Sequence, residues 1–550
     1  MKFSNMGIMA VLMLLGMSQA VSAVTVSGEL RQWHKTTLTF NGPSTSETAP
    51  TNPFLDYRLD VTFTQGGKSY TVPGYYAANG DAGNTGASSG SKWRVHFAPP
   101  STGRWNWRAS FKQGTGIAVS SAAGTSTHFD GQSGSFKVSV SNKSGDDFRG
   151  KGLIQLARDK HYLQFAGTGK YWMKGGTDSP EDFLGCSDFD NTTSGSSFAT
   201  TDYPSHVRDW KSGDPTWRNG KGKGIIGALN YLGSQKVNSV YFLPMNLGGD
   251  GKNTHPFAST SNDLVYDVSK LDQWAMVFDH AQKHGILLHV VLNEAEAANR
   301  NRLDGGRLGR ERKLFYRELA ARFGYVNGLM WNICEEGVGS FKPATIMKSF
   351  ADYVRSVDPY DHPIGVHNWI KADGIDVVFA DFYGHPSIDY LSIQYRSSYT
   401  RTDYPDPRYP NLLGDLRVAT AKAGRPLALM GDELEMTRTS DDEGYRTGVV
   451  AQGGMQWQRK GQLWQWYLSG GAGVEYILST VLNTHDFRQY EPLWRYTRKP
   501  PAPRRSRPQA RGGYAKSNFL SVDHAICGTY RAERAVVNAR SDKSDCIFED

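Results

Sequence analysis

Cysteine is scarce in this sequence, and three motifs built on cysteine, histidine or glycine are missing from it. The 550 residues include four cysteines, which do not make a disulfide framework, and no two of them form a CxxC pair. There is also no HExxH and no GxxxxGK[ST]. Zinc sites, metalloproteases and phosphate-binding loops therefore lack support, and we expect neither a metal nor a cofactor.

The sequence also lacks an apolar run of about 20 residues, the length that a membrane-spanning helix needs. The first 23 residues instead carry the parts of an export signal, with Lys2 near the start, an apolar stretch at Ile8–Met17 and the small residues Val21-Ser22-Ala23. We expect cleavage after Ala23, no membrane span, and a soluble mature protein that is secreted or periplasmic.

No strong charge of one sign marks most of the chain. There are 62 Lys and Arg against 54 Asp and Glu, a net charge of +8, and half of this excess lies in residues 499–550. A nucleic-acid surface normally appears as a basic stripe in the folded part, so we expect no nucleic-acid partner. The aromatic content of 12% is high. It is typical of carbohydrate-handling proteins, although most rings fill cores.

Residues 24–142 contain short runs in which apolar and polar residues alternate. Clusters of Gly, Pro, Asn and Ser separate these runs. Period-two alternation between turn residues predicts an antiparallel β-sandwich, and the polar stretch Ser141–Gly150 predicts a linker. The predicted strands are Tyr57–Phe63, Ser69–Val72, Lys92–Phe97, Trp105–Phe111 and Ser135–Val140.

Residues 150–498 show a different pattern, in which eight apolar runs alternate with amphipathic helical stretches such as Leu271–His284 and Arg310–Phe323. Alternating β and α units predict a parallel sheet, and eight units predict a (β/α)8 TIM barrel of the α/β class. An open doubly wound sheet is the rival fold, but no GxGxxG follows an early strand. The predicted strands are Tyr171–Lys174, Ser239–Leu243, Ile286–Leu292, Leu329–Ile333, Ile364–Val366, Tyr390–Ile393, Leu427–Met430 and Gly473–Ile477.

Residues 499–550 do not continue this pattern. The segment Lys499–Pro508 is rich in proline and arginine, and no sustained period follows it. We expect a tail that is disordered or out of frame, with a basic anchoring tail as the alternative.

Functional groups of such barrels gather where the strands end. Carboxylates end the fourth and seventh predicted strands, which are far apart in sequence but face each other across a closed barrel. Hydrolysis of a glycosidic bond needs two carboxyl groups, one protonated and one ionised. The alternative is that these acids only cap helices or lie in solvated loops.

The segment Trp331-Asn332-Ile333-Cys334-Glu335-Glu336 resembles the fourth-strand motif of the large clan of retaining (β/α)8 glycosidases, which includes β-galactosidases and cellulases. The resemblance implies that Glu336 is the acid/base. Glu335 departs from the motif, because the clan has there an Asn that contacts the sugar 2-hydroxyl. Residues 425–433 resemble the seventh-strand segment, which implies that Glu433 is the nucleophile, with Asp432 and Glu435 as competitors.

Three further stretches resemble a family of secreted bacterial proteins that carry an N-terminal β-sandwich of unknown function followed by a glycoside-hydrolase-like barrel. The stretches are Lys174–Leu184, Phe242–Asn253 and Arg312–Phe323, and residues 27–112 resemble the sandwich. The resemblance covers residues 27–498.

These observations predict a secreted glycoside hydrolase that cleaves O-glycosidic bonds of a polysaccharide or oligosaccharide with retention of configuration. A non-catalytic carbohydrate-binding or surface protein is the alternative, and a polysaccharide lyase is a third possibility. Adjacent residues leaving a strand point to opposite sides, so one of Glu335 and Glu336 should face the substrate, and Glu335 could itself be the acid, so the acid/base assignment stays open between the two. The expected catalytic residues are Glu336 and Glu433, and the expected substrate contacts are Asp178, Asn246, Glu294, Glu335, His367 and Gln394.

Overall fold

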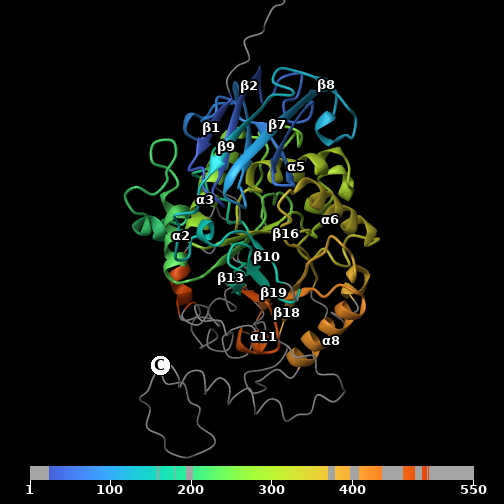
Figure 1. The fold of residues 1–550 in the computed structure, drawn as a ribbon. Helices are drawn as coiled ribbons and strands as arrows, with labels where there is room; N and C mark the ends of the chain where they lie inside the picture. The colour runs from blue at the N-terminus through green and yellow to red at the C-terminus, as the bar shows by residue number, and fades with distance from the viewer. Residues whose placement is uncertain are drawn as a thin grey trace, which may run out of the picture.

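The computed structural model describes residues 24–157, 160–178, 180–193, 202–249, 251–369, 378–396, 408–435, 463–476, 486–491 and 494. Figure 1 shows a β-rich N-terminal part stacked on a larger part in which helices surround a sheet. The expected export signal at residues 1–23 and the tail at 499–550 lie outside the described residues.

The N-terminal part contains two antiparallel sheets, in the strand orders β1-β2-β6-β5 and β4-β3-β7-β8, and β9 also pairs with β7. Four of the predicted runs fall within strands, the run Ser135–Val140 extends two residues past the end of β9, and the structure adds β1, β2, β5 and β8. The bounds are β1 Thr25–Gly28, β2 Thr36–Ser46, β3 Tyr57–Gln65, β4 Lys68–Pro73, β5 Tyr75–Tyr76, β6 Ser89–Phe97, β7 Gly103–Gln113, β8 Thr125–Ser126 and β9 Ser133–Val138.

Alternation of apolar side chains builds the core between these sheets. Along β3 the odd-numbered positions from Tyr57 to Phe63 are buried, while the residues between them are partly exposed. Phe63 stacks on Phe97 of β6 with ring centroids 4.2 Å apart. Each sheet therefore buries one face against the other, as its sequence pattern predicts.

The second part is a closed barrel of eight parallel strands, in chain order from β13 to β20. Pairing of β20 with β13 closes the circle, which confirms the predicted α/β barrel class. The bounds are β13 Lys174–Thr177, β14 Ser239–Phe242, β15 Leu287–Val291, β16 Leu329–Asn332, β17 Ile364–His367, β18 Tyr390–Arg396, β19 Ala428–Glu435 and β20 Gly473–Tyr476.

The first barrel strand is not where the sequence predicted it. Tyr171–Trp172 forms β12, which belongs to a separate antiparallel sheet with β10 (Ile154–Leu156) and β11 (Leu163–Phe165). The barrel strand β13 begins at Lys174 and contains two glycines. A strand with a lysine and two glycines carries no hydrophobic pattern, so the prediction placed the strand three residues too early.

Helices surround the barrel and connect its strands (Figure 1). The side chain of Asp267 caps helix α3 by accepting a hydrogen bond from the backbone N–H of Lys270, at 2.9 Å. The α-helices are α1 Ala82–Thr85, α2 Lys223–Ser234, α3 Val268–Lys283, α4 Ala297–Arg300, α5 Arg310–Phe323, α6 Thr345–Val357, α8 Arg408–Lys422 and α11 Trp464–Leu468. Short 3-10 helices are Ile117–Val119, Phe148–Gly150, Pro204–Asp209, Asp304–Gly306, Ala380–Phe382 and Phe487–Tyr490.

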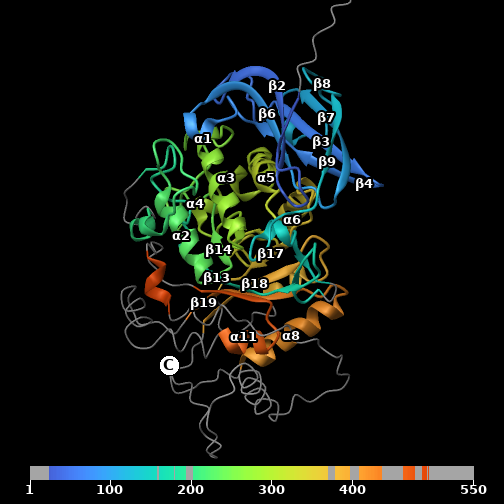
Figure 2. The ribbon, with the colours of Figure 1, turned by 60° about the vertical axis from the view of Figure 1, so that its left-hand side comes forward.

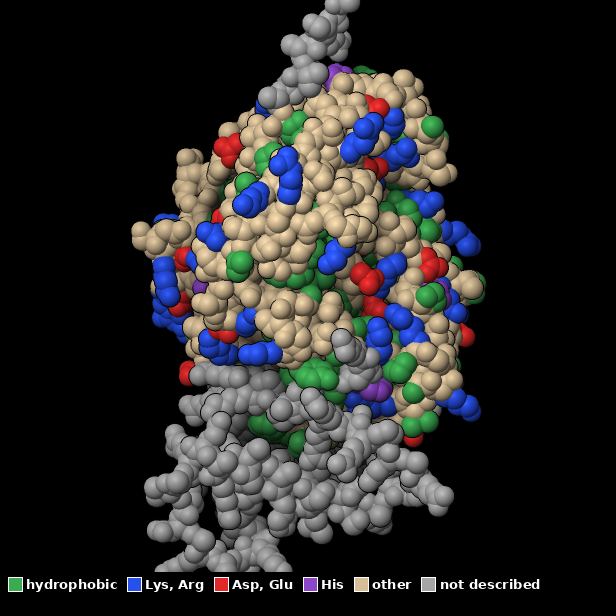
Figure 3. All heavy atoms as spheres, in the orientation of Figure 1, with side chains coloured by type: hydrophobic (Ala, Val, Ile, Leu, Met, Phe, Trp, Pro, Cys, Tyr) green, Lys and Arg blue, Asp and Glu red, His purple; other side chains and the backbone are tan. Residues whose placement is uncertain are grey.

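The surface view in Figure 3 shows basic and acidic side chains interspersed on one face, without a continuous basic stripe there. Within the described ranges, none of the helices combines the length and apolarity that crossing a bilayer requires.

The sandwich packs on the outer side of helices α3 and α5 (Figure 2). Arg317 of α5 donates hydrogen bonds to the carbonyl of Leu59 at 2.9 Å and to the carboxylate of Asp60 at 2.8 Å. Arg322 lies over the ring of Tyr75, 4.2 Å from its centroid, and pairs with Glu318. Buried arginines on a barrel helix thus form part of the contact with the sandwich.

A carboxyl group at this contact predicts a pH dependence of stability. Glu47 accepts a hydrogen bond from the backbone N–H of Val268 at 2.8 Å, and burial raises its pKa to about 7. Its folded pKa lies above its unfolded value, so its contribution to stability is complete below pH 4.5 and is lost as the pH rises through 7.

We therefore expect Glu47→Gln, whose amide oxygen still accepts this hydrogen bond, to be more stable than the wild type at pH 8 by about 1–3 kcal/mol. At pH 5 the two proteins should differ little. Urea unfolding at both pH values measures this, and a difference that is the same at pH 5 and pH 8 would contradict it.

Candidate active site

The carboxyl ends of β16, β18 and β19 bring Glu336, Gln394 and Glu433 together. The side-chain amide of Gln394 donates one hydrogen bond to Oε1 of Glu336 at 3.0 Å and another to Oε1 of Glu433 at 2.6 Å. Because both bonds start at one nitrogen, the two oxygens lie no more than about 5.6 Å apart. Retaining glycosidases hold their carboxyl groups ~5–5.5 Å apart, whereas inverting enzymes need ~6.5–9.5 Å.

Glu336 has an unusual backbone conformation. Its φ is 45°, in the left-handed region that a residue with a Cβ rarely adopts. Its backbone N–H donates to Nδ1 of His367 at 2.9 Å. The simple alternation of side chains therefore does not apply at Glu335 and Glu336, and such strained positions concentrate at functional sites.

His367 is neutral and faces Glu433. Burial, followed by the charges of His289 and Lys174, lowers its pKa to about 3. Nδ1 accepts a hydrogen bond, so the proton of the neutral ring is on Nε2, which lies 3.7 Å from Oε2 of Glu433. At this distance the N–H makes an electrostatic contact with the carboxylate and not a hydrogen bond.

A β-bulge in β19 places two consecutive acids inside the barrel. Gly431 pairs with Ile393 and Glu433 pairs with Gln394, so Asp432 is an extra residue in β19. Without the bulge, strict alternation would place an inward Asp432 next to an outward Glu433, because side chains alternate along a strand. The bulge lets both side chains point inward.

Asp432 is held by a buried polar layer below the site. Its carboxylate accepts hydrogen bonds from the Lys174 ammonium and from Ser392, the latter at 2.7 Å. Lys174 also contacts Glu475 at 2.9 Å and His289 at 3.3 Å, and all of these side chains are buried. Asp432 is therefore an anchor of the bulge, which argues against its role as the nucleophile.

The same layer could be taken for a metal site. Ligand atoms of His289, Asp432 and Glu475 lie within 4.8 Å of one another. The ammonium of Lys174, however, contacts all three side chains. The cation among these ligands is thus a lysine of the chain itself.

Glu335 faces a different neighbour from Glu336. Its carboxyl group is 6% exposed and is hydrogen-bonded to that of Glu181. Burial, followed by the negative charges of Glu181, Glu294 and Glu433, raises the pKa of Glu335 well above its usual value. The neutral form of Glu335 is therefore favoured more strongly than that of an ordinary glutamate.

The other predicted contacts lie around this centre or beside it. Glu294 accepts a hydrogen bond from Asn299 at 2.8 Å and lies against Gly249, where a Cβ would come within 1.7 Å of its carboxylate. Asp178 is buried after β13, and Asn246 is buried with no partner for its side-chain atoms among the described residues. Glu435 ends β19, and its side chain lies outside the described part.

Sequence reasoning did not single out Tyr241, Lys174 or Glu181 as members of the site. Tyr241 is an inward residue of β14 that lies 4.8 Å from His289 and 6.2 Å from His367, measured between ring centroids. From the sequence alone, this tyrosine cannot be distinguished from an aromatic residue that only fills the core. Knowledge of which face of β14 points inward is what identifies it.

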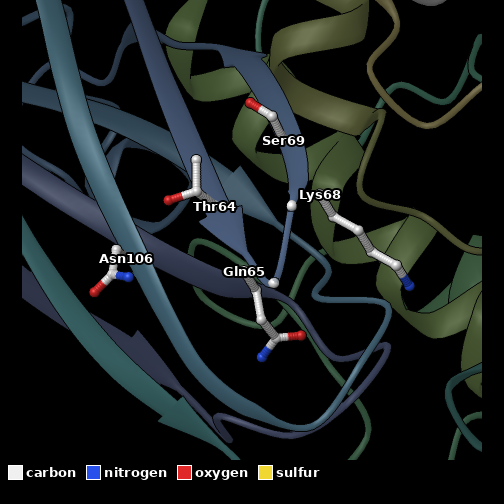
Figure 4. Close-up of a pocket in the computed structure, with 7 residues that line it drawn as sticks. Thr64, Gln65, Lys68, Ser69 and Asn106 are labelled. Carbon is white, nitrogen blue, oxygen red and sulfur yellow. The ribbon is translucent and has the colours of Figure 1, made fainter.

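A pocket on the sandwich lies apart from these residues, at the turn between β3 and β4 beside β7 (Figure 4). Its lining is polar and includes Thr64, Gln65, Lys68, Ser69 and Asn106. The side chain of Gln65 is already bonded to Ser101 and to backbone carbonyls. The lining contains no aromatic ring on which a sugar could stack.

Comparisons with known proteins support the fold. Residues 29–112 match a family described as a domain of unknown function, DUF5060. No curated protein matches the sequence. A crystal structure from Bacteroides vulgatus, provisionally described as a glycoside hydrolase, is 17% identical with a TM-score of 0.52, and the match covers 81% of this chain and 71% of that one.

Two further structures are less similar. A glycoside hydrolase family 5 protein from Bacteroides vulgatus is 15% identical, with a TM-score of 0.37 and coverage of 59% of this chain and 62% of that one. A family 5 mannosidase from Rhizomucor miehei is 12% identical, with a TM-score of 0.41 and coverage of 60% and 86%. The similarity of fold rests on the first of these three structures, with its TM-score of 0.52.

Proposed function

We propose that this protein is a secreted glycoside hydrolase that cleaves O-glycosidic bonds of a polysaccharide or oligosaccharide with retention of anomeric configuration. The observation that carries the proposal is the amide of Gln394, which bonds to both Glu336 and Glu433 and sets an upper limit of about 5.6 Å on the separation of the two bonded oxygens. The glycoside hydrolases among proteins of similar fold are consistent with it.

In the first step, Glu433 attacks the anomeric carbon as the bond to the leaving oxygen breaks. Glu336, in its protonated form, transfers its proton to that oxygen, so that the leaving sugar departs as a neutral alcohol. The product is a covalent ester between the sugar and Glu433. A separation as short as this leaves no room for a water between the two groups, which favours direct attack.

In the second step, the roles at Glu336 reverse. Its carboxylate takes a proton from a water molecule as the water attacks the anomeric carbon from the side that the leaving group vacated. The ester bond breaks and Glu433 is released as a carboxylate. The hydrogen bond from the amide of Gln394 favours the ionised form of Glu433 before and after each turnover, and the N–H of His367 lies 3.7 Å away.

A panel of plant and algal polysaccharides tests the proposal. We expect the wild type to release new reducing ends from at least one substrate. We expect Glu433→Ala to release none. Binding without cleavage would favour a non-catalytic carbohydrate-binding protein. Unsaturated products that absorb in the near ultraviolet would indicate a lyase instead.

A chemical rescue experiment tests the assignment of the acid/base. Glu336→Ala should lower turnover of an activated aryl glycoside by about 10²–10⁴-fold, the usual contribution of general acid–base catalysis. Azide should restore turnover because it replaces water in the second step and needs no base. The product should be a glycosyl azide.

The matched variant is Glu335→Ala, which alters the neighbouring carboxyl group. Azide should not restore its activity. If azide rescues Glu335→Ala and not Glu336→Ala, the roles of the two residues are exchanged.

A further inference from the structure

The carboxyl pair of Glu335 and Glu181 is not used by the reaction proposed above, although it lies beside the nucleophile. Glu335 is 6% exposed and Glu181 is 2% exposed. The backbone N–H of Leu243, just after β14, donates to the carbonyl of Glu181 at 3.1 Å, which holds Glu181 beside the strand of Tyr241. Like-charge repulsion between Glu181 and Glu335 favours a form of the pair that holds a proton. Oε2 of Glu335 has no hydrogen-bond partner among the described residues.

Tyr241 supplies an independent observation at the same place. Its side chain is 2% exposed, and its hydroxyl has no hydrogen-bond partner among the described residues. The negative charges that act most strongly on this hydroxyl are those of Glu335, Glu181 and Glu433, and they raise its pKa after the larger effect of burial. A buried hydroxyl without a partner is costly, so its position among these acids indicates that a ligand group completes the arrangement.

We propose that the hydroxyl of Tyr241 and the carboxyl pair of Glu335 and Glu181 form a subsite for a primary ammonium group carried by the sugar, so that the preferred substrate contains an amino sugar. This proposal rests on the proposed function. An ammonium has three donors, which suit one oxygen of Glu335, one of Glu181 and the oxygen of Tyr241. When it binds, the proton held by the carboxyl pair passes to the solvent, and the ammonium lies between the two carboxylates.

A metal ion fits these residues less well. A divalent cation needs several oxygen ligands around one point. Among the described residues, the three acidic or imidazole groups whose ligand atoms lie within 4.8 Å of one another are His289, Asp432 and Glu475. Glu181, Glu294, Glu335 and Glu433 do not form such a group. An ammonium requires fewer and less convergent acceptors.

The pH dependence follows from the groups around Glu335. It is faced by Glu181 after β13, Tyr241 of β14, Glu294 after β15 and Glu433 of β19. All of them are acids, so Glu335 is protonated in the free protein at low pH. Affinity for an ammonium sugar should rise as the pair loses its proton, and fall again when the sugar amine loses its own.

Isothermal titration calorimetry with three hexasaccharides of one linkage tests this inference. They are the β-1,4 hexamers of glucosamine, N-acetylglucosamine and glucose, which differ only at carbon 2. The glucosamine hexamer should bind at least tenfold more tightly than either neutral hexamer at pH 6. Titrations in two buffers of different ionisation enthalpy should show that its binding releases a proton.

The variants are Glu335→Gln and a control, Glu29→Gln, which changes a half-exposed acid of the sandwich. Glu335→Gln should weaken binding of the glucosamine hexamer by about 10–100-fold, as expected for a hydrogen bond to a charged group. Binding of the glucose hexamer should change less than about threefold. Glu29→Gln should bind both hexamers with the affinity of the wild type, because Glu29 lies on the sandwich. The net charge of +8 also gives the protein no general attraction for a cationic sugar.

Equal affinity of the wild type for the three hexamers, including absence of binding by all three, would overturn the inference. So would binding of the glucosamine hexamer without proton release, a result that needs no variant to fold. Reducing ends from neutral polysaccharides without an ammonium preference would leave the proposed hydrolase intact and remove the subsite alone. An ammonium preference without any cleavage would support the subsite and contradict the proposed hydrolase.

Discussion

Replacing Glu433 by alanine is expected to lower kcat/KM by about 10⁴–10⁶-fold on every substrate, the range seen when a member of a catalytic unit is removed. Without this carboxylate the covalent intermediate of the proposed reaction cannot form. The loss should be the same for activated and natural substrates. Initial rates on an aryl glycoside and on the best polysaccharide of the panel measure it.

Two comparisons make this result specific to the nucleophile. Glu433→Ala should unfold at a denaturant concentration close to that of the wild type, and Glu29→Ala on the sandwich should keep full activity. Azide should restore turnover of Glu433→Ala on an activated substrate only with inversion of configuration, because it then attacks the sugar directly. A Glu433→Ala protein with more than a few per cent of wild-type activity would show that another acid is the nucleophile.

Replacing Lys174 by methionine is expected to lower the free energy of unfolding by about 3–5 kcal/mol, because it removes the cation from a buried set of ionisable groups. The Lys174 ammonium is bonded to the carboxylates of Asp432 and Glu475, and all three side chains are fully buried. Burial already raises the pKa of both acids. Without the lysine they must bind protons or remain charged in the barrel interior.

The sign of the pH effect follows from this. In Lys174→Met the two acids are neutral at low pH and costly when ionised, so the loss of stability should be larger at pH 8 than at pH 5. Lys68→Met, at an exposed lysine of β4, is the matched control and should change stability by less than about 0.5 kcal/mol. Urea unfolding of both variants at the two pH values measures these differences.

Removing the two buried acids together with the lysine should restore the stability that Lys174→Met loses. The triple variant Lys174→Met/Asp432→Asn/Glu475→Gln removes the three charges together and should recover most of the loss. A Lys174→Met protein that unfolds at the same urea concentration as the wild type would show that this layer contributes no net stability.

Strand positions with a clear hydrophobic pattern were predictable from the sequence. Helix α5 begins and ends where the periodicity predicts, and β14 to β17 differ from their predicted ranges by one residue or less at each end. β13 was placed three residues too early because its inward side chain is a lysine. The charge of this lysine is balanced by acids more than 250 positions away in the sequence. Only the closed barrel reveals that partnership.

The active site was likewise predictable where a local motif exists and not where long-range contacts decide. The sequence motif selected Glu336 and Glu433, and the structure places both on the amide of Gln394. The sequence left Asp432 as a competitor, because a one-residue bulge has no signature in the hydrophobic pattern. The acid pair of Glu335 and Glu181 was also invisible, since it joins loops after β16 and β13 that are 154 residues apart in the chain.

The bulge in β19 has a consequence for how this sequence can change over evolutionary time. Deletion of the codon for residue 432 would return β19 to strict alternation with Glu433 still opposite Gln394, and it would remove the carboxylate that binds Lys174. Loss of Lys174 would leave the anchor of the same bulge without its counter-charge. We therefore expect the amino acids at positions 174 and 432 to covary among homologues, and descendants that lose catalysis to be free to lose both together.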